Sequence, residues 1–419
     1  SLLDFSPLTS ITPTSRFYSY DTSTNKYATI LDPAATPFSM ANGYLIRMPN
    51  NWSTSTASSY SGQFSGTPNN GSFVHTMSLG GTVTTGFGYN AVGNPYPSAL
   101  NVAAFIDGNI SPAVVSDNIE GTLWFWRKTN NPLTSISYTT ITKAGISNLG
   151  NVGSGFYPDP SVISIGQGFI VQAKTATLNY NNAMRSSSNV NQFFKESPKN
   201  RYWIELKNKD AVSFGQNLIA YLDGATLGYD NGYDGLFIND VKTTLLTLSG
   251  DKEVVIQARP EFNNQDVLPL IFKTDVAGTY TINLAETEGL FNNGQEILLK
   301  DKVTGLTQIL NNASYSFTTI EGSFTDRFEI TYQNSLAVST PNFNENNVVV
   351  YKKNQALVIS SGNVIIDNVK VYDIQGRLLF DKTKVNASEL KISTNTTNEI
   401  LLVKIILKNS EVVTKKVIN

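Results

Sequence analysis

The sequence predicts an all-β chain built from tandem antiparallel β-sandwiches. Short runs of alternating apolar and polar residues recur along the chain, and clusters of Pro, Gly, Asn and Ser separate them, as expected for strands joined by turns. No stretch shows the 3.6-residue apolar period of a long amphipathic helix. A chain of 419 residues is long enough for roughly two to four domains. We therefore expect several β-domains in series.

The composition excludes several classes of function. The chain has no cysteine and one histidine, which excludes disulfides, Cys–His nucleophile pairs and zinc sites built from Cys and His. A net charge of −2 with 15% charged residues leaves no electrostatic footprint for nucleic acid. No apolar run approaches the roughly 20 residues that cross a bilayer as a helix. The abundance of Asn, Ser, Thr, Gly and Tyr favours an extracellular β-protein over a cytoplasmic enzyme.

Residues 1–195 are predicted to form the first sandwich, which we expect to be jelly-roll-like. Its clearest strand segments are Arg16–Tyr20, Gly43–Met48, Gly71–Val74 and Gly168–Ala173. The segment Gly93–Ser98 is a rigid loop, because each of its two prolines fixes its own φ and favours an extended residue before it. A short helix is expected at Asn101–Ile106.

Residues 196–335 are predicted to form a second sandwich that begins with the alternating segment Arg201–Leu206. Further strands are expected at Asn217–Leu222, Val254–Ala258, Leu268–Lys273, Gly278–Leu284, Ile297–Asp301, Ser314–Thr318 and Arg327–Tyr332. Roughly eight strands in this length suit one sandwich. Residues 336–347 are rich in Asn and contain Pro341, so we expect a linker there.

Residues 348–419 are predicted to form a third, immunoglobulin-like sandwich. Alternation runs through Val369–Asp373, and Gly376 supplies the positive φ that a tight hairpin turn needs. The residues Leu401, Val403, Ile405 and Leu407 recur at period two, with Ile400 and Ile406 on the other face. This pattern predicts a central strand that is buried on both faces. From Asn342 onward there are 11 Lys+Arg against 7 Asp+Glu, a net of +4, which leaves −6 for the residues before it and supports a domain boundary near residue 340.

The run from Val369 to Arg377 and the close of the chain resemble the C-terminal sorting domain of proteins exported by the type IX secretion system of Bacteroidota. The family pattern is a V-x-V-Y-D-x-x-G-R strand–turn–strand followed by a basic-then-apolar last strand. The matching residues are Val371, Tyr372, Asp373, Gly376 and Arg377 in the first motif, and Lys415, Lys416, Val417 and Ile418 in the last strand. The usual Asn-Pro near the domain start and the usual Gly-x-Tyr before the penultimate strand are absent, being replaced by Lys352–Asn354 and Asn398–Ile400.

A second resemblance points in the same direction. The segments Gly93–Pro97, Leu123–Trp126 and Gly166–Val171 are similar to a region of flavobacterial surface proteins. This second likeness supports a surface location and implies no activity. The resemblance to the sorting domain implies export through the periplasm, recognition by the outer-membrane translocon and its shuttle β-barrel, and release or anchoring through lipopolysaccharide. It also implies cleavage of an exported chain in the linker. An ordinary immunoglobulin-like module at the end of a multidomain protein remains the alternative.

The function we expect is that of a non-catalytic C-terminal portion of a secreted, adhesin-like cell-surface protein, with gliding motility as a natural context. Ser1–Pro13 resembles the continuation of an earlier domain, so we expect a longer precursor. The alternative is a carbohydrate-binding or polysaccharide-degrading exoprotein that uses the same export route. In this chain the Asp and Glu residues are scattered over turns, and no two of them stand out as the pair of carboxylates that a glycosidase needs.

His75 and the pair Trp124 and Trp126 are further candidate site residues. His75 would have to serve any Ser-His-Asp triad, but it lies within an apparent strand, where a non-catalytic histidine is far more common. Trp124 and Trp126 share one strand face and, if exposed, could stack on surface glycans together with loops around Tyr89, Tyr96 and Tyr157. Burial of the tryptophan pair in the core is the alternative.

The most distinctive polar cluster is the segment Asp223–Gly235. Its carboxylates and glycine-rich turns offer the hard oxygen ligands that calcium prefers, although the spacing is not that of an EF-hand. One hypothesis is a structural calcium site held by Asp223, Asp230 and Asp234. The other is a turn in which Asp and Asn side chains cap backbone amides.

Overall fold

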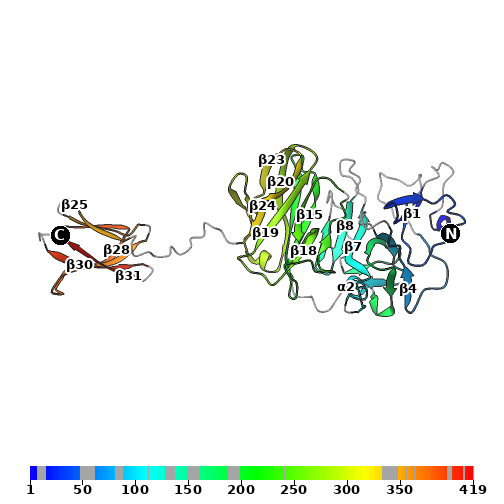
Figure 1. Ribbon diagram of the computed structural model, residues 1–419, viewed down its shortest axis with the longest axis horizontal. Coiled ribbons are helices and arrows are strands. Elements are labelled where there is room, and N and C mark those ends of the chain that lie inside the picture. The colour runs from blue at the N-terminus through cyan, green and yellow to red at the C-terminus, as the bar shows by residue number, and fades with distance from the viewer. Residues whose placement is uncertain are drawn as a thin grey trace. The chain divides into compact units, whose positions relative to one another are not determined.

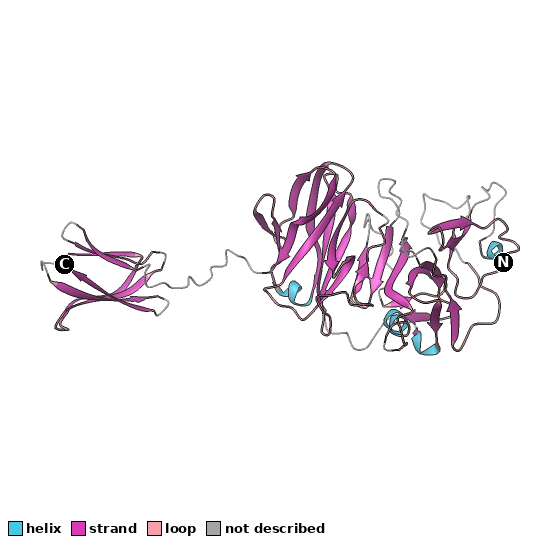
Figure 2. Cartoon of the chain, in the orientation of Figure 1, coloured by secondary structure: helices cyan, strands magenta, loops and turns pink. Residues whose placement is uncertain are grey.

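A computed structural model describes residues 1–6, 16–47, 62–80, 88–111, 113–127, 137–148, 161–186, 199–239, 241–332, 348–353, 356–362, 364–393, 399–408 and 411–418. The chain divides into two compact units, Ser1–Gln333 and Asn334–Asn419. Strands dominate both units (Figure 1, Figure 2), so the predicted all-β class is confirmed. The predicted linker at 336–347 lies outside the described residues.

The first part of the larger unit is organised around a five-stranded antiparallel sheet in the order β5-β11-β7-β8-β9. Its strands are β5 (Tyr89–Gly93), β11 (Gly168–Ala173), β7 (Ile119–Arg127), β8 (Ser137–Thr142) and β9 (Gly145–Asn148). Three small sheets surround it. They comprise β1 (Phe17–Asp21), β2 (Lys26–Thr29) and β3 (Tyr44–Ile46); β4 (Phe73–Thr76) and β12 (Thr177–Tyr180); and β6 (Ala99–Asn101), β10 (Val162–Ile163) and β13 (Arg185–Ser186).

The described residues of this part also form the short helices α1 (Leu2–Phe5) and α2 (Val102–Asp107) and the 3₁₀ turn η1 (Asn182–Met184). The helix predicted at Asn101–Ile106 corresponds to α2. It begins where it does because the Asn101 side chain accepts a hydrogen bond from the Ala104 amide at 2.8 Å, which caps the first turn. Its apolar face, with Phe105 and Ile106 fully buried, packs into the first core.

Strand β7 separates two cores by the period-two alternation of its side chains. Leu123 and Phe125 face the core that also contains Phe105 and Phe169. Trp124 and Trp126 face the opposite way, into a smaller cluster with Tyr138 and Ile170. The prediction that the two tryptophans share one face therefore matches the packing.

The second part of the larger unit is an eleven-stranded sheet in the order β22-β21-β24-β19-β17-β18-β15-β14-β20-β23, with β16 beside β18. Its strands are β14 (Asn200–Asn208), β15 (Ser213–Tyr221), β16 (Gly235–Leu236), β17 (Thr244–Ser249), β18 (Lys252–Arg259), β19 (Val267–Thr274), β20 (Gly278–Glu288), β21 (Leu298–Asp301), β22 (Leu306–Ile309), β23 (Tyr315–Thr319) and β24 (Gly322–Thr331), with the 3₁₀ helix η2 (Gly289–Asn293) after β20. It encloses an aromatic-rich core that includes Tyr202, Phe272 and Phe328.

One pairing departs from the expected antiparallel pattern. Strands β15 and β18 pair in parallel, with Leu218 opposite Ile256 and Ala220 opposite Ala258. Parallel neighbours need a long crossover connection, and the chain between Leu222 and Asp251 supplies it by way of β16 and β17. This crossover contains the polar segment Asp223–Gly235.

The two parts share an apolar interface within one compact unit. Ala144, in the turn between β8 and β9, packs with Trp203 of β14 and Leu218 of β15. The Trp203 indole donates to the Ile146 carbonyl at 2.7 Å, and the Arg201 guanidinium donates to the Ala144 carbonyl at 2.7 Å. The regions predicted as separate domains at 1–195 and 196–335 are thus packed against each other, and most of the segment that joins them, 187–198, lies outside the described residues.

The smaller unit is a two-sheet sandwich. One sheet contains β25 (Val349–Lys353), β26 (Ala356–Ser360) and β29 (Glu389–Ser393), and the other has the order β28-β27-β30-β31. The latter strands are β27 (Ile366–Asp373), β28 (Leu378–Ala387), β30 (Ile400–Leu407) and β31 (Val412–Ile418). The two inner faces enclose one aliphatic core.

Strand β30 corrects one expectation. It is central, between β27 and β31, but only the face with Leu401, Val403 and Ile405 is buried. The opposite face carries Lys404 and the 36% exposed Leu402, so burial on both faces was wrong. The reason is that the smaller unit has two layers, and the outer face of each sheet meets solvent.

Candidate functional site

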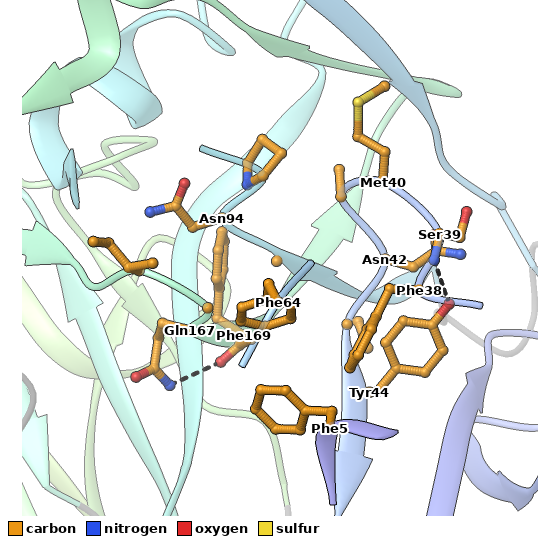
Figure 3. Close-up of a pocket in the computed structure, with 18 of the residues that line it drawn as sticks. Phe5, Phe38, Ser39, Met40, Asn42, Tyr44, Phe64, Asn94, Gln167 and Phe169 are labelled. Atoms are coloured by element: carbon orange, nitrogen blue, oxygen red, sulfur yellow. Dashed lines mark hydrogen bonds between the residues drawn. The ribbon is translucent and has the colours of Figure 1, made fainter. Parts of the chain in front are cut away.

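An open pocket of about 880 Å³ lies in the first part of the larger unit (Figure 3). It is bordered by Phe5 of α1 and by four segments that are far apart in the sequence, at residues 38–46, 62–69, 93–97 and 165–170. Two of these segments carry the motif Gly93–Pro97 and all but the last residue of the motif Gly166–Val171. The structure thus brings together motifs that the sequence indicated only by resemblance.

The segment that carries Phe38 and Tyr44 is held against β5 by close backbone contact. The Gly43 amide donates to the Ala91 carbonyl at 2.9 Å, and the Gly93 amide donates to the Ala41 carbonyl at 2.9 Å. A Cβ on Gly43 would stand 2.8 Å from the Val92 carbonyl oxygen, a contact that side chains do not make. Glycine at position 43 is therefore needed to place this pocket wall.

Asn94 explains the motif Gly93–Pro97 structurally. Its side-chain amide donates to the carbonyls of Ser98, Ile163 and Ser164 at 2.8, 3.2 and 3.1 Å, while its oxygen accepts from the Tyr96 amide at 3.0 Å. The Tyr96 side chain is buried, and its hydroxyl donates to the Gly71 carbonyl at 2.7 Å. Asn94 thus ties the loop after β5 to the loop after β10 and fixes one side of the pocket.

Aromatic rings make up much of the opposite side. Phe5 lies 4.8 Å from Phe64 and 5.4 Å from Phe38 between ring centroids, and Phe38 lies 5.5 Å from Tyr44. Phe64 stays 54% exposed despite these contacts. Figure 3 shows Phe64 in the middle of the view, with Phe38 and Tyr44 on one side of it and Asn94 and Gln167 on the other.

The described lining of the pocket contains no Asp, Glu, Lys, Arg or His. Its polar groups are amides, hydroxyls and backbone atoms, and its ionisable groups are tyrosines. Burial raises the pKa of Tyr27, so this phenol remains neutral at physiological pH. The lining described here is equipped to bind a ligand through ring faces and neutral hydrogen bonds.

The tryptophan pair does not form an exposed platform. Trp124 is fully buried, and its indole donates to the Leu236 carbonyl at 3.1 Å, which corrects the expectation of a stacking role for this residue. Trp126 is half-buried between Tyr27 and Tyr138, with ring centroids 5.6 Å away in both cases. Both tryptophans are among the residues that line the pocket. Tyr89 is half-buried against Trp124, and Tyr157 lies outside the described residues.

The polar segment Asp223–Gly235 uses its carboxylates mainly for backbone hydrogen bonds. Asp234 is fully buried and accepts from the amides of Asp230 and Ala258 at 2.7 and 2.8 Å. Asp230 accepts from the Thr226 amide at 2.6 Å, and Asp223 is exposed. No group of three His, Cys, Asp or Glu side chains that could hold a metal occurs among the residues with described positions. The calcium site stays a prediction.

Burial raises the pKa of Asp234 to about 6, against the hydrogen bonds from Asp230, Ala258 and Ser249, which lower it. The Ser249 hydroxyl donates to this carboxylate at 3.0 Å. Desolvation prevails because the Asp234 side chain is fully buried, so its ionised form loses its water.

His75 lies in β4, opposite Leu178 of β12, and is half-buried. Burial lowers its pKa, which favours the neutral imidazole. None of the hydrogen bonds or ion pairs found within the described part of the chain joins it to a serine or a carboxylate. The geometry thus provides no support for a triad.

In the smaller unit, Asp373 and Arg377 close the turn between β27 and β28. The Asp373 carboxylate accepts from the amides of Gln375 and Arg377, both at 2.9 Å, and from the Arg377 guanidinium at 2.6 Å. Gly376 has φ +81° within this turn, as its place in the motif predicted. Val371 points into the core, while Tyr372 lies on the outer face in register with Leu402.

The last strand, β31, stands at the edge of its sheet. Among the described strands it pairs only with β30, from Ile406–Val412 to Ile400–Ile418. Lys415 and Val417 are half-buried, whereas Lys416 and Ile418 lie on the exposed face. The expected sorting residues thus fall into two sets, one at the turn and one on an edge strand.

Comparison with known protein families assigns the chain to families whose function is not known. The chain belongs to a family described as a domain of unknown function (DUF8693), whose model matches residues 1–332. A second family, also a domain of unknown function (DUF8694), matches residues 336–419. No curated protein matches the chain. In the parts of the chain with described positions, no helix is long and apolar enough to cross a membrane.

Sequence reasoning missed the pocket residues Phe5, Phe38, Tyr44 and Phe64. Each comes from a different local context, since Phe5 lies in α1, Tyr44 in β3, and Phe38 and Phe64 in loops, so their convergence depends on tertiary packing. One signal was present in the sequence. No Asp, Glu, Lys or Arg occurs between Arg47 and Asp107, although such residues are spread over the rest of the chain.

Proposed function

We propose that the chain is the non-catalytic C-terminal portion of a secreted, adhesin-like cell-surface protein, exported by the type IX secretion system through its C-terminal unit. Recognition would involve the outer-membrane translocon and its shuttle β-barrel, with release or lipopolysaccharide anchoring afterwards. In a gliding bacterium the exported part would serve surface adhesion during motility.

The observation that carries the proposal is the placement of the two motif sets on a separate compact unit. The turn residues Asp373 and Arg377 are locked by hydrogen bonds, and β31 lies at a sheet edge. An edge strand has backbone amides and carbonyls available on one side, so a partner can add a strand to it. Both motif sets belong to the compact unit Asn334–Asn419.

Deletion of residues 348–419 tests the proposal in a bacterium with a type IX system. We expect the truncated protein to accumulate in the periplasm, whereas the full chain reaches the surface and becomes accessible to external protease. A sharper variant reverses the two lysines of β31, Lys415→Glu with Lys416→Glu. Its matched control reverses two exposed lysines of β28, Lys382→Glu with Lys384→Glu.

The β31 variant should lose surface display and the β28 variant should retain it. Surface display of the deletion mutant at the level of the full chain would refute the export role. The alternative, a polysaccharide-degrading exoprotein, would be favoured by turnover of a polysaccharide by the intact chain.

A further inference from the structure

The pocket beside Phe64 has no part in the export proposal. The charge and polarity of its lining residues indicate which class of ligand it can bind. Its volume of about 880 Å³ falls within the roughly 300–1,000 Å³ of small-molecule sites. Its lining combines aromatic side chains with amide and hydroxyl groups, and such polar groups orient a ligand in a pocket. We propose that this pocket binds an uncharged glycan.

The first argument is charge. The described lining has no ionic side chain, and the chain between Arg47 and Asp107, which contributes many lining residues, contains no Asp, Glu, Lys or Arg. Arg16, which directly precedes β1, is fully buried, and its guanidinium donates to the Ser6 hydroxyl and to the Arg47 carbonyl. A phosphate, carboxylate or ammonium group on a ligand would lose water here without gaining an opposite charge, which is costly.

The second argument is the pairing of ring faces with neutral polar groups. Phe64 is half-exposed, Phe38 lies 5.1 Å from it between ring centroids, and Tyr44 in turn packs on Phe38. The C–H face of a sugar ring is apolar and packs on an aromatic ring by burial and dispersion. A wall of adjoining rings suits a ligand that repeats such faces.

The third argument separates a sugar from a purely apolar ligand. The side chains of Asn42 and Gln63 are exposed at the pocket, and Gln167 uses its amide nitrogen on the Gly168 carbonyl at 3.1 Å, which leaves its side-chain oxygen as an acceptor. An alkyl chain would desolvate such groups without replacing their hydrogen bonds. Sugar hydroxyls donate and accept, so they match amide side chains in both roles.

The test measures binding of the intact 419-residue chain to a panel of neutral oligosaccharides, to uronic-acid oligosaccharides of matched length and to a fatty acid. We expect at least one neutral oligosaccharide to bind, and to bind more tightly than its acidic counterpart. Preference for the acidic glycans, binding of the fatty acid alone, or no binding of any neutral glycan would overturn the proposal.

Two variants assign the binding to this pocket. Phe64→Ala should weaken binding of the neutral glycan at least about tenfold, because it removes a central ring contact, and Phe64→Trp should restore it. The control Ile320→Ala truncates another exposed apolar side chain, in the turn between β23 and β24, and should leave binding unchanged. Equal binding by the wild type and Phe64→Ala would show that any glycan binds elsewhere.

The readout is independent of export. Glycan binding in solution does not require the C-terminal unit to be recognised, and surface display does not require the pocket. Each proposal can therefore fail while the other stands, and the thermal melting curve of Phe64→Ala checks that lost binding is not lost folding.

Discussion

Gly121 of β7 and Gly232 of the crossover loop lie backbone to backbone, so close that a Cβ on Gly121 would stand 2.4 Å from the Gly232 Cα. The Asn231 side chain reinforces this approach by accepting from the Gly121 amide at 2.6 Å. Nearby, the Thr142 hydroxyl donates to the Tyr233 carbonyl at 2.7 Å, and the Lys143 amide donates to the Gly232 carbonyl at 2.9 Å. The polar crossover loop thus joins the five-stranded sheet to the eleven-stranded sheet by close backbone packing and hydrogen bonds, and we call this contact the seam.

Gly121→Ala should destabilise the larger unit by about 1–3 kcal/mol, the usual cost of overpacking, because both sides of the contact are backbone and cannot move aside easily. The control is Gly278→Ala, since nothing lies within 4 Å of a Cβ at Gly278 and its φ is not in the left-handed region. Denaturant unfolding should show a lowered midpoint for Gly121→Ala and an unchanged or slightly raised one for Gly278→Ala. Equal stabilities of the two variants would contradict a tight seam.

Most strands could be predicted from the sequence because their side chains alternate between a buried and a solvated face. The segment Gly168–Ala173 was predicted as a strand and forms β11 with the same bounds. Period alone could not tell how many layers cover a sheet, so the outer face of β30, with Leu402 and Lys404, was wrongly expected to be buried.

The candidate site was less predictable, because it depends on contacts between distant segments. Phe5 and Phe64 lie 4.8 Å apart between ring centroids, yet neither has a neighbouring residue that signals the other. Trp124 shows the converse limit, since its spacing correctly gave its strand face but not strand β16, whose Leu236 packs on it. The alternation of apolar and polar residues shows which side chains share a strand face. Whether that face is buried depends on the elements that pack against it.

Asp234 should make stability depend on pH with a definite sign. Its folded pKa of about 6 exceeds the value of roughly 4 expected in the unfolded chain. Protonation therefore favours the folded state, and this contribution is fully present below about pH 4 and is lost as the pH rises through about 6. The two pKa values differ by about 2 units, which amounts to ~3 kcal/mol at most.

The measurement compares the free energy of unfolding of the wild type and Asp234→Asn from pH 4 to pH 7, since the other carboxylates then cancel. We expect the wild type to lose stability relative to the variant over this interval. A constant difference would mean that Asp234 keeps an ordinary pKa, with its hydrogen bonds from Asp230, Ala258 and Ser249 offsetting burial.

Calcium gives a separate test of the same loop. If Asp223, Asp230 and Asp234 hold a calcium ion, millimolar calcium should raise the melting temperature, since a ligand that binds only the folded state stabilises it. Asp223→Asn should abolish that shift, and because Asp223 is exposed it should scarcely alter the melting temperature without calcium. Equal melting temperatures with calcium and with chelator would leave backbone capping as the whole role of these carboxylates.

Asp373 should be the most sensitive polar residue of the C-terminal hairpin. The hydrogen bond from the Arg377 amide, together with those from the Arg377 guanidinium and the Gln375 amide, holds the pKa of the Asp373 carboxyl below its usual value. A lowered folded pKa means that the contribution of Asp373 to stability is present above about pH 4 and is lost as the pH falls through the folded value.

Asp373→Ala should therefore lower the melting temperature of the smaller unit at pH 7, and the difference from the wild type should shrink in acid. The control is Asp381→Ala on β28, which removes a single surface ion pair with Lys370 at 3.3 Å and should cost less than about 1 kcal/mol. If both variants melt alike at pH 7, the turn does not depend on the carboxylate, and conformational preference around Gly376, with its φ of +81°, is enough to form it.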